Sequence, residues 1–237
     1  MGAYGVWRVL SAAPEEVSLD AAVAAVKQQE ASNTDAGDEA VAGNKGTDAA
    51  GDAVSLNGVW RVDSETGSFS FEESTGSFVG FRVKEELAKI GATTAVGRTD
   101  QVTGELSIDG SAIQTVSISA DLSSIVTNDS RRDSAARYAL NVKQNPTATF
   151  NLTQPLELPQ IDGSKVSVRA EGQLTVNAIT RDVNVDLDAQ LVDNTIVVVG
   201  STKVTFSDYD VTAPSAAIVL SVDDHGVVEF QLLFSRK

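Results

Sequence analysis

The sequence predicts an all-β protein, either a closed antiparallel barrel or a sandwich, with one short helix inserted between its strands. Two stretches, 165–176 and 182–191, alternate apolar and polar residues, as strands with one buried face do. Similar alternation recurs from residue 58 onward and gives about ten strands. Closure into a barrel would explain how so many strands avoid exposed edges.

The first 57 residues differ from the rest of the chain. Ser18–Glu30 predicts a helix, because Ser18 can cap it and apolar residues follow at helical spacing. The next stretch is rich in Gly, Ala and Asp without periodicity, so we expect a flexible acidic linker. The predicted organisation is an N-terminal segment at 1–30, a linker at 31–57 and a barrel domain at 58–237.

The pentapeptide GVWRV occurs at Gly5–Val9 and again at Gly58–Val62. The residues after the two copies diverge, so they do not form a structural repeat. The second copy leads into alternating sequence and is predicted to be the first barrel strand. We interpret the first copy as a recurrence of the sequence that is not part of the barrel. The alternative is that it forms an extra edge strand.

The remaining barrel elements follow from the same alternation. Only Ser130–Val142 interrupts it, and this segment predicts one short helix between strands. Strands are predicted near 58–63, 67–72, 77–84, 101–109, 112–122, 147–153, 165–176, 182–191, 194–206 and 226–235.

Composition excludes several classes of function. The net charge of −15 argues against binding to nucleic acid or to anionic membrane surfaces, which need clustered Lys and Arg. No apolar run approaches the ~18 residues of a membrane helix, and no signal peptide is evident. We therefore expect membrane association only through a leader or anchor outside this sequence.

The sequence does not predict an enzyme or a cofactor. It lacks the nucleophile elbow, the dinucleotide fingerprint and the P-loop. The single histidine, His225, lies in a DDHG stretch that predicts a tight turn, and one imidazole cannot build a multi-histidine metal site. The carboxylates of Asp208, Asp210, Asp223 and Asp224 do not match a calcium loop and are interpreted as solvated loop residues.

Alternation directs many large apolar side chains toward one interior. A barrel of about eight strands can be filled by such side chains or can hold one small ligand, and periodicity does not decide between a core and a cavity. The candidate residues for a ligand-binding interior are Phe81, Val83, Leu106, Ile108, Val116, Ile118, Leu122, Phe150, Leu152, Val166, Val168, Leu174, Val185, Leu187, Phe206, Phe230, Leu232 and Phe234.

Six ordered motifs resemble the YceI-like family of bacterial, lipocalin-like barrels that bind polyisoprenoid lipids. Each motif alone is weak, but their order is specific, and the resemblance that rests on them covers residues 58–237. The motifs are WRVD (Trp60–Asp63), SFVGFRVKEEL (Ser77–Leu87), VGRTDQVTGELSID (Val96–Asp109), the pair Arg132-Asp133, NPTATF (Asn145–Phe150) and GQLTVNAITRDVNVDL (Gly172–Leu187).

The resemblance implies a lipocalin-like barrel of about 8–10 strands that binds, carries or sequesters an isoprenoid lipid or quinone without catalysis. It also implies an extracytoplasmic location: periplasmic, secreted or anchored in the cell envelope. In the hairpin turn, Asn177-Ala178 replaces the family's frequent His-Gly, which puts a head-group role at that position in doubt.

Two points remain open at this level. Arg131 and Arg132 are candidates for binding the head group of the ligand, if that group is a pyrophosphate. Alternatively, Arg132 and Asp133 form a structural ion pair. The alternative to lipid carriage is a filled barrel that acts as an interaction module, with an acidic tail that binds a protein partner. A homodimer is compatible with either function.

Overall fold

The computed structural model describes residues 13–35, 55–159, 163–214 and 217–236. The first GVWRV copy and most of the predicted linker lie outside these residues.

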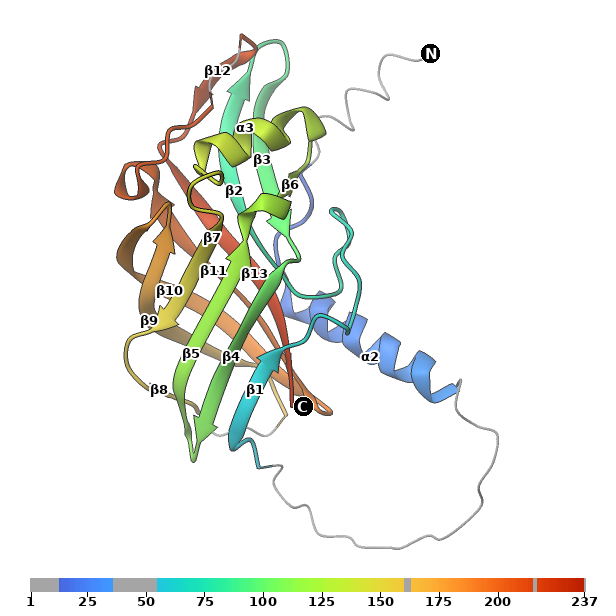
Figure 1. The fold of residues 1–237 in the computed structure, drawn as a ribbon. Coiled ribbons are helices and arrows are strands. Elements are labelled where there is room, and N and C mark those ends of the chain that lie inside the picture. Colours follow the sequence, from blue (N-terminus) through green and yellow to red (C-terminus); the bar gives the residue numbers. More distant parts are fainter. Residues whose placement is uncertain (1–12, 36–54, 160–162, 215–216, 237) are drawn as a thin grey trace, which may run out of the picture.

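Figure 1 shows a long barrel with α3 and β12 at one end, called here the upper end, and β1 and β8 toward the other. The wall strands are β1 (Gly58–Val62), β4 (Val102–Asp109), β5 (Ala112–Asp121), β7 (Thr147–Leu152), β9 (Val166–Val176), β10 (Ile179–Val192), β11 (Thr195–Thr205) and β13 (His225–Ser235).

These eight strands close an antiparallel barrel, as predicted. Neighbours pair in the order β1-β4-β5-β7-β9-β10-β11-β13. Closure comes from the end of β13, where Ser235 and Phe234 face Arg61 and Val62 of β1. Because β1 begins at Gly58, the second GVWRV copy is the first barrel strand.

The upper part of the wall is extended by strands that branch from β13. β2 (Phe78–Leu87) pairs with β13, β3 (Gly91–Thr99) pairs with β2, and the short β6 (Val126–Thr127) pairs with β3. The remaining elements are short: β8 (Leu156–Glu157), β12 (Val219–Val222), α3 (Asp133–Ala139) and the 3-10 turns η1 (Leu122–Ser124), η2 (Ser130–Arg132) and η3 (Phe206–Tyr209).

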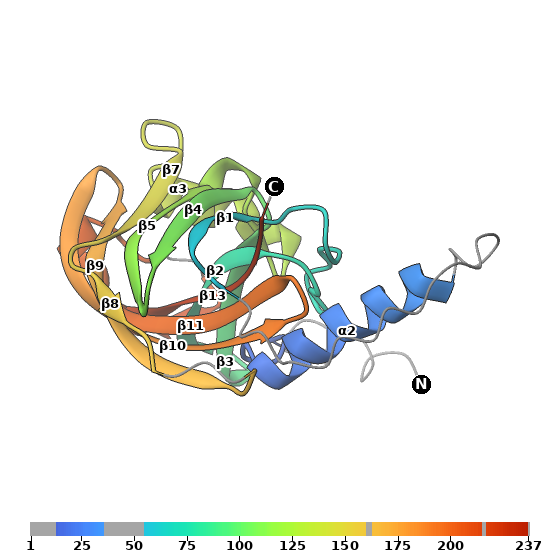
Figure 2. The same cartoon turned by 90° about the horizontal axis from the view of Figure 1, so that it is seen from below.

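The N-terminal helix α2 (Leu19–Asp35) packs against the outside of the barrel, as Figure 2 shows from below. It is longer than predicted, so residues 31–35 are helical and not linker. Four of its residues, Leu19, Ala22, Val23 and Val26, form one buried cluster with residues of three wall strands, Val192, Val197, Val199 and Leu233. The helix therefore covers an apolar strip that would otherwise face solvent.

A buried charge cluster holds the chain just before this helix. Glu229 on β13 is 1% exposed and pairs with Arg98 at 2.8 Å and with Arg82 at 3.4 Å. Both guanidinium groups donate to the Glu15 carbonyl, and Arg82 also donates to that of Pro14. The two arginines thus use their remaining donors to fix the N-terminal segment to the wall.

Two predicted elements differ in the structure. The strand predicted at 67–72 is a loop, because the Asp63 carboxylate accepts hydrogen bonds from the Glu65 and Thr66 amides and Gly67 takes a φ of 81°. The segment at 91–99 forms strand β3 although its small residues, GATTAVGRT, showed no clear alternation. No helix in the described part of the chain is long and apolar enough to cross a membrane.

Candidate functional site

The barrel contains two neighbouring cavities. The lower chamber has a volume of about 170 Å³, and the upper chamber has a volume of about 400 Å³. Leu174 on β9 and Val228 on β13 line both of them, which places the two spaces end to end along one lumen.

The lower chamber is almost entirely apolar. Its wall consists of alternate residues of the barrel strands, such as Ile118, Val185 and Leu232. Leu56, Leu156 and Leu158 line it from outside the main strands. Several inward side chains, among them Leu187 and Phe230, are only partly buried although they point inward. Their remaining accessible surface faces the cavity, so the barrel is not completely filled.

The upper chamber has a mixed lining and opens to solvent. Ala135, Ala136, Ala139 and Leu140 place one face of α3 over it. Three exposed residues, Arg131, Pro214 and Ile218, also line it and mark its mouth. A long apolar molecule could enter at this end and extend toward the lower chamber.

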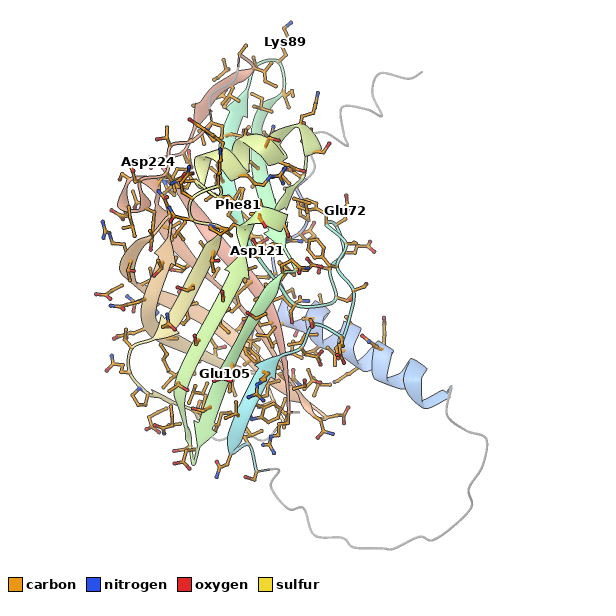
Figure 3. All side chains as sticks on the ribbon, viewed as in Figure 1. Glu72, Phe81, Lys89, Glu105, Asp121 and Asp224 are labelled. Carbon is orange, nitrogen blue, oxygen red and sulfur yellow. The ribbon has the colours of Figure 1, made fainter. Side chains whose placement is uncertain are left out.

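Glycines let interior aromatic rings lie against the wall, among them Phe81 and Phe230. A Cβ at Gly200 would lie 2.5 Å from Phe230 Cζ, and one at Gly97 would lie 2.5 Å from Phe81 Cε1. Each ring therefore occupies the space over a neighbouring strand that a larger residue would fill. Figure 3 places Phe81 toward the end that carries α3, whereas Glu105 lies on β4 nearer the opposite end.

Most residues proposed for the interior line these chambers. Leu122 does not, because it is buried in turn η1 at the end of β5. Phe81, Val83 and Phe206 line the upper chamber, and Leu174 lines both. The lower chamber is lined by Leu106, Ile108, Val116, Ile118, Phe150, Leu152, Val166, Val168, Val185, Leu187, Phe230, Leu232 and Phe234.

The two proposed head-group arginines line the upper chamber, but each already has a carboxylate partner. Arg131 pairs with Asp129 at 2.6 Å, and the hydrogen bond from Arg131 lowers the pKa of the Asp129 carboxyl. Arg132 pairs with Glu85 on β2. The predicted Arg132–Asp133 pair is absent from the ion pairs of the described residues, since Asp133 accepts hydrogen bonds from the Thr127 amide and hydroxyl. The contact that fastens this turn to the wall is Arg132–Glu85.

Asn177 ties together three segments next to the upper chamber, which its neighbour Val176 lines. It lies in the β9–β10 turn with φ of 51°, and Ala178 follows with φ of 60°. The Asn177 amide oxygen accepts hydrogen bonds from Asn141 and Asn145, and its amide nitrogen donates to the Tyr209 carbonyl at 3.1 Å. Asn177 is therefore a structural tether between these segments.

Sequence reasoning missed part of the chamber lining. Val79, Ile196, Val198 and Val228 follow the same alternation as predicted neighbours and could have been found from it. Tyr209 lines the upper chamber from turn η3, where no periodicity indicates which way a side chain points.

The single histidine and the acidic residues do not form a metal-binding cluster among the described residues. His225 begins β13, and its Nδ1 lies 2.8 Å from the Asp224 carboxylate, which is exposed. Within the described ranges, no three His, Asp or Glu side chains gather closely enough to hold a metal ion.

Comparison with known proteins identifies relatives of this barrel. A family model described as the YceI-like domain matches residues 60–234. A UPF0312 protein of Pseudomonas aeruginosa is 29% identical over 118 residues, which cover 48% of this chain and 56% of that protein. A UPF0312 protein of Pseudomonas paraeruginosa matches to the same extent. The chain thus spans a little over half the length of the curated relatives it matches.

Two solved structures share the fold. One is a polyisoprenoid binding domain from Saccharophagus degradans implicated in plant cell wall breakdown, with 18% identity and a TM-score of 0.52. The match covers 68% of this chain and 94% of that one. The other is BcnA of Burkholderia cenocepacia, with 17% identity, a TM-score of 0.52, and coverage of 73% and 98% respectively.

Proposed function

The chain belongs to the YceI-like domain family, and on that premise we propose that its barrel binds and carries an isoprenoid lipid or quinone without catalysing a reaction. The observation that carries the proposal is the pair of adjacent chambers inside the barrel, which share Leu174 and Val228 in their linings. The lower chamber is almost entirely apolar, and the upper chamber has charged residues in its lining, as a molecule with a hydrocarbon tail and a polar end requires.

The energetics of such a ligand suit the lining. Burial of a hydrocarbon tail gains about 0.8 kcal/mol per CH₂ before the cost of ordering it. Binding therefore needs no charged or catalytic group in the lower chamber, which is lined by side chains such as Val168, Leu187 and Phe230. The name of the Saccharophagus degradans domain, a relative in fold, supports a polyisoprenoid as the ligand class.

The same family membership supports a place outside the cytoplasm. We infer that the protein acts in the cell envelope, where it is periplasmic, secreted or held at a membrane by an anchor. The low solubility of prenyl lipids in water supports this location. Such a lipid partitions into bilayers, so it needs a carrier protein to cross the aqueous space between membranes.

The alternative, a filled barrel that acts as an interaction module, has less support. It requires a packed interior, whereas the lumen holds two cavities. In this alternative the partner would engage the acidic helix and linker or the barrel surface, and the apolar residues Leu19, Val23 and Val26 of the helix are already buried against the barrel.

A matched pair of variants on β9 tests lipid binding. Leu174→Lys places a charge where the two chambers meet, whereas Gln173→Lys places the same group on the exposed outer face one residue away. Titration of the full chain with a long-tailed prenyl quinone, followed by native mass spectrometry, should show one bound ligand in the wild type and in Gln173→Lys. Leu174→Lys should lose it.

Failure of the wild type to bind prenyl quinones or prenyl alcohols would contradict the proposal. Equal binding by a folded Leu174→Lys variant would show that the ligand does not occupy the lumen. If Leu174→Lys does not fold, Val228→Leu serves instead, because it narrows the same junction with an apolar side chain.

A further inference from the structure

Large apolar side chains that are exposed to solvent lie mainly at the upper end of the barrel. The described part of the chain has four of them: Val59, Tyr138, Ile218 and Leu220. Val59 lies on β1, toward the lower end. Tyr138 lies on α3, Ile218 directly precedes β12, and Leu220 lies within it, all at the upper end (Figure 1). Apolar side chains exposed together, and not singly, indicate a surface that contacts a membrane or a protein.

The three upper side chains border the upper chamber. Ile218 lines the chamber and is also 54% exposed, so its side chain lies at the opening. Tyr138 directly precedes Ala139, which lines the chamber, and Leu220 directly follows Val219, which does so too. A molecule that enters or leaves the chamber at this end therefore passes beside an apolar rim, defined here as Tyr138, Ile218 and Leu220.

The segments that carry the apolar rim do not share the acidic character of the chain, whose net charge is −15. Residues 217–222 contain no charged side chain, and residues 129–143 contain four basic and two acidic ones. The β2–β3 turn next to β12 carries the exposed Lys89 at the tip of the upper end, and Asp224 lies farther from that tip (Figure 3). This end can therefore meet a zwitterionic bilayer surface without bringing the more acidic parts of the chain against it.

From these observations, and on the basis of the proposed function, we propose that the apolar rim docks on the surface of a phospholipid bilayer and that the ligand passes directly between the bilayer and the upper chamber. Ile218 and Leu220 enter the boundary between head groups and acyl chains. The ring of Tyr138 lies at the same depth with its hydroxyl group toward water, as tyrosines at membrane interfaces do. The prenyl tail thus avoids contact with bulk water during transfer.

A bilayer fits this surface better than a protein partner does. A stable protein interface takes about 20–30 residues on each side, and the apolar rim has three. Contact with a bilayer strengthens with each apolar side chain that enters it, and a brief contact is enough for the transfer of one lipid. The apolar rim also lies beside the chamber that we propose for the ligand, which itself resides in bilayers.

The test measures the rate at which the full chain takes a long-tailed prenyl quinone from phosphatidylcholine vesicles. The variant combines Tyr138→Ser with Leu220→Ser, because both residues are exposed and neither lines a chamber. The matched control is Val59→Ser, which removes an exposed apolar side chain from the lower end. For each protein, thermal unfolding and the affinity for the same quinone, added from detergent without vesicles, are measured in parallel.

We expect the rate constant for loss of quinone from the vesicles to rise with the concentration of the wild-type protein, because each transfer needs a collision with the bilayer. The double variant should slow transfer about tenfold, since two apolar side chains no longer enter the bilayer. Its affinity for quinone from detergent and its unfolding temperature should match those of the wild type. Val59→Ser should behave as the wild type does in every assay.

Three results would overturn the inference while the proposed function stands. The first is a rate constant independent of protein concentration, which would show that the quinone crosses water before it binds. The second is an unchanged rate in the double variant, which would leave the apolar rim to a protein partner, and the third is an equal slowing by Val59→Ser. If the double variant does not fold, Tyr138→Ser alone replaces it, because this residue is 88% exposed. Failure of the wild type to bind quinone from detergent would instead contradict the proposed function itself.

Discussion

Substitution of Ala189 by leucine would measure how far the ligand tail reaches into the lower chamber. Ala189 lies on β10 opposite Val166 and Val198, and its side chain lines this chamber. Leucine adds three carbon atoms at a place where the structure has empty space. The variant should therefore fill part of the cavity of about 170 Å³ without a change in the fold.

The expected changes in the free energies of unfolding and of binding follow from the number of carbon atoms removed from water. Three added carbons at about 0.8 kcal/mol each stabilise the free protein by up to about 2 kcal/mol, because they fill a void and displace no packed side chain. A tail that reaches Ala189 loses burial of a similar number of carbons, which weakens binding by about 2 kcal/mol, or ~30-fold. A ligand too short to pass Leu174 loses nothing.

The assay is a calorimetric or native mass spectrometric titration with two prenyl quinones, one long-tailed and one with a single prenyl unit. Ala189→Leu should discriminate against the long tail only. The control is Ala92→Leu, which adds the same atoms to an exposed position on β3. Equal affinity of Ala189→Leu and the wild type for the long-tailed quinone would refute the placement of the tail, as would an equal loss for both quinones.

Three further changes test other parts of the account. Gly97→Ala should push the Phe81 ring into the upper chamber and weaken quinone binding by about tenfold, and unchanged affinity would contradict the role of this glycine. Glu229→Gln should cost about 3–5 kcal/mol in urea unfolding, because it leaves two buried arginines without a counter-charge, and a loss below about 1 kcal/mol would show that the cluster is solvated. Val23→Asp should release α2 from the wall and expose Val197 and Leu233, which dye binding and amide exchange would detect. Unchanged protection of β11 would show that the helix does not cover it.

The sequence was sufficient to predict the barrel and most of its lining, because strand alternation is a direct consequence of a wall with one apolar face. β9 shows this well, since Val166, Val168, Ala170 and Leu174 all line a chamber. Strand β3 escaped notice because its GATTAVGRT sequence has few large apolar residues. The loop at 67–72 was mistaken for a strand, because its Ser and Phe residues alternate while side-chain hydrogen bonds to the backbone hold a turn.

Features that depend on side-chain geometry could not be predicted. Periodicity indicates that Phe150 and Phe230 face inward, but only the structure shows that cavities remain beside them. The partner of Arg131 is local, because Asp129 caps the same turn, whereas the partner of Arg132 is Glu85 on β2, a distant contact that periodicity does not specify. The N-terminal helix was predicted, but its docking to the barrel depends on which outer residues happen to be apolar.

The central claim is that a hollow barrel holds one lipid, and native mass spectrometry of the purified full chain tests it most directly. The account predicts a single adduct, retained from the host or formed with an added prenyl quinone, that solvent extraction identifies as an isoprenoid lipid or quinone. A protein that carries no adduct and binds neither prenyl quinones nor prenyl alcohols when they are added would contradict the account.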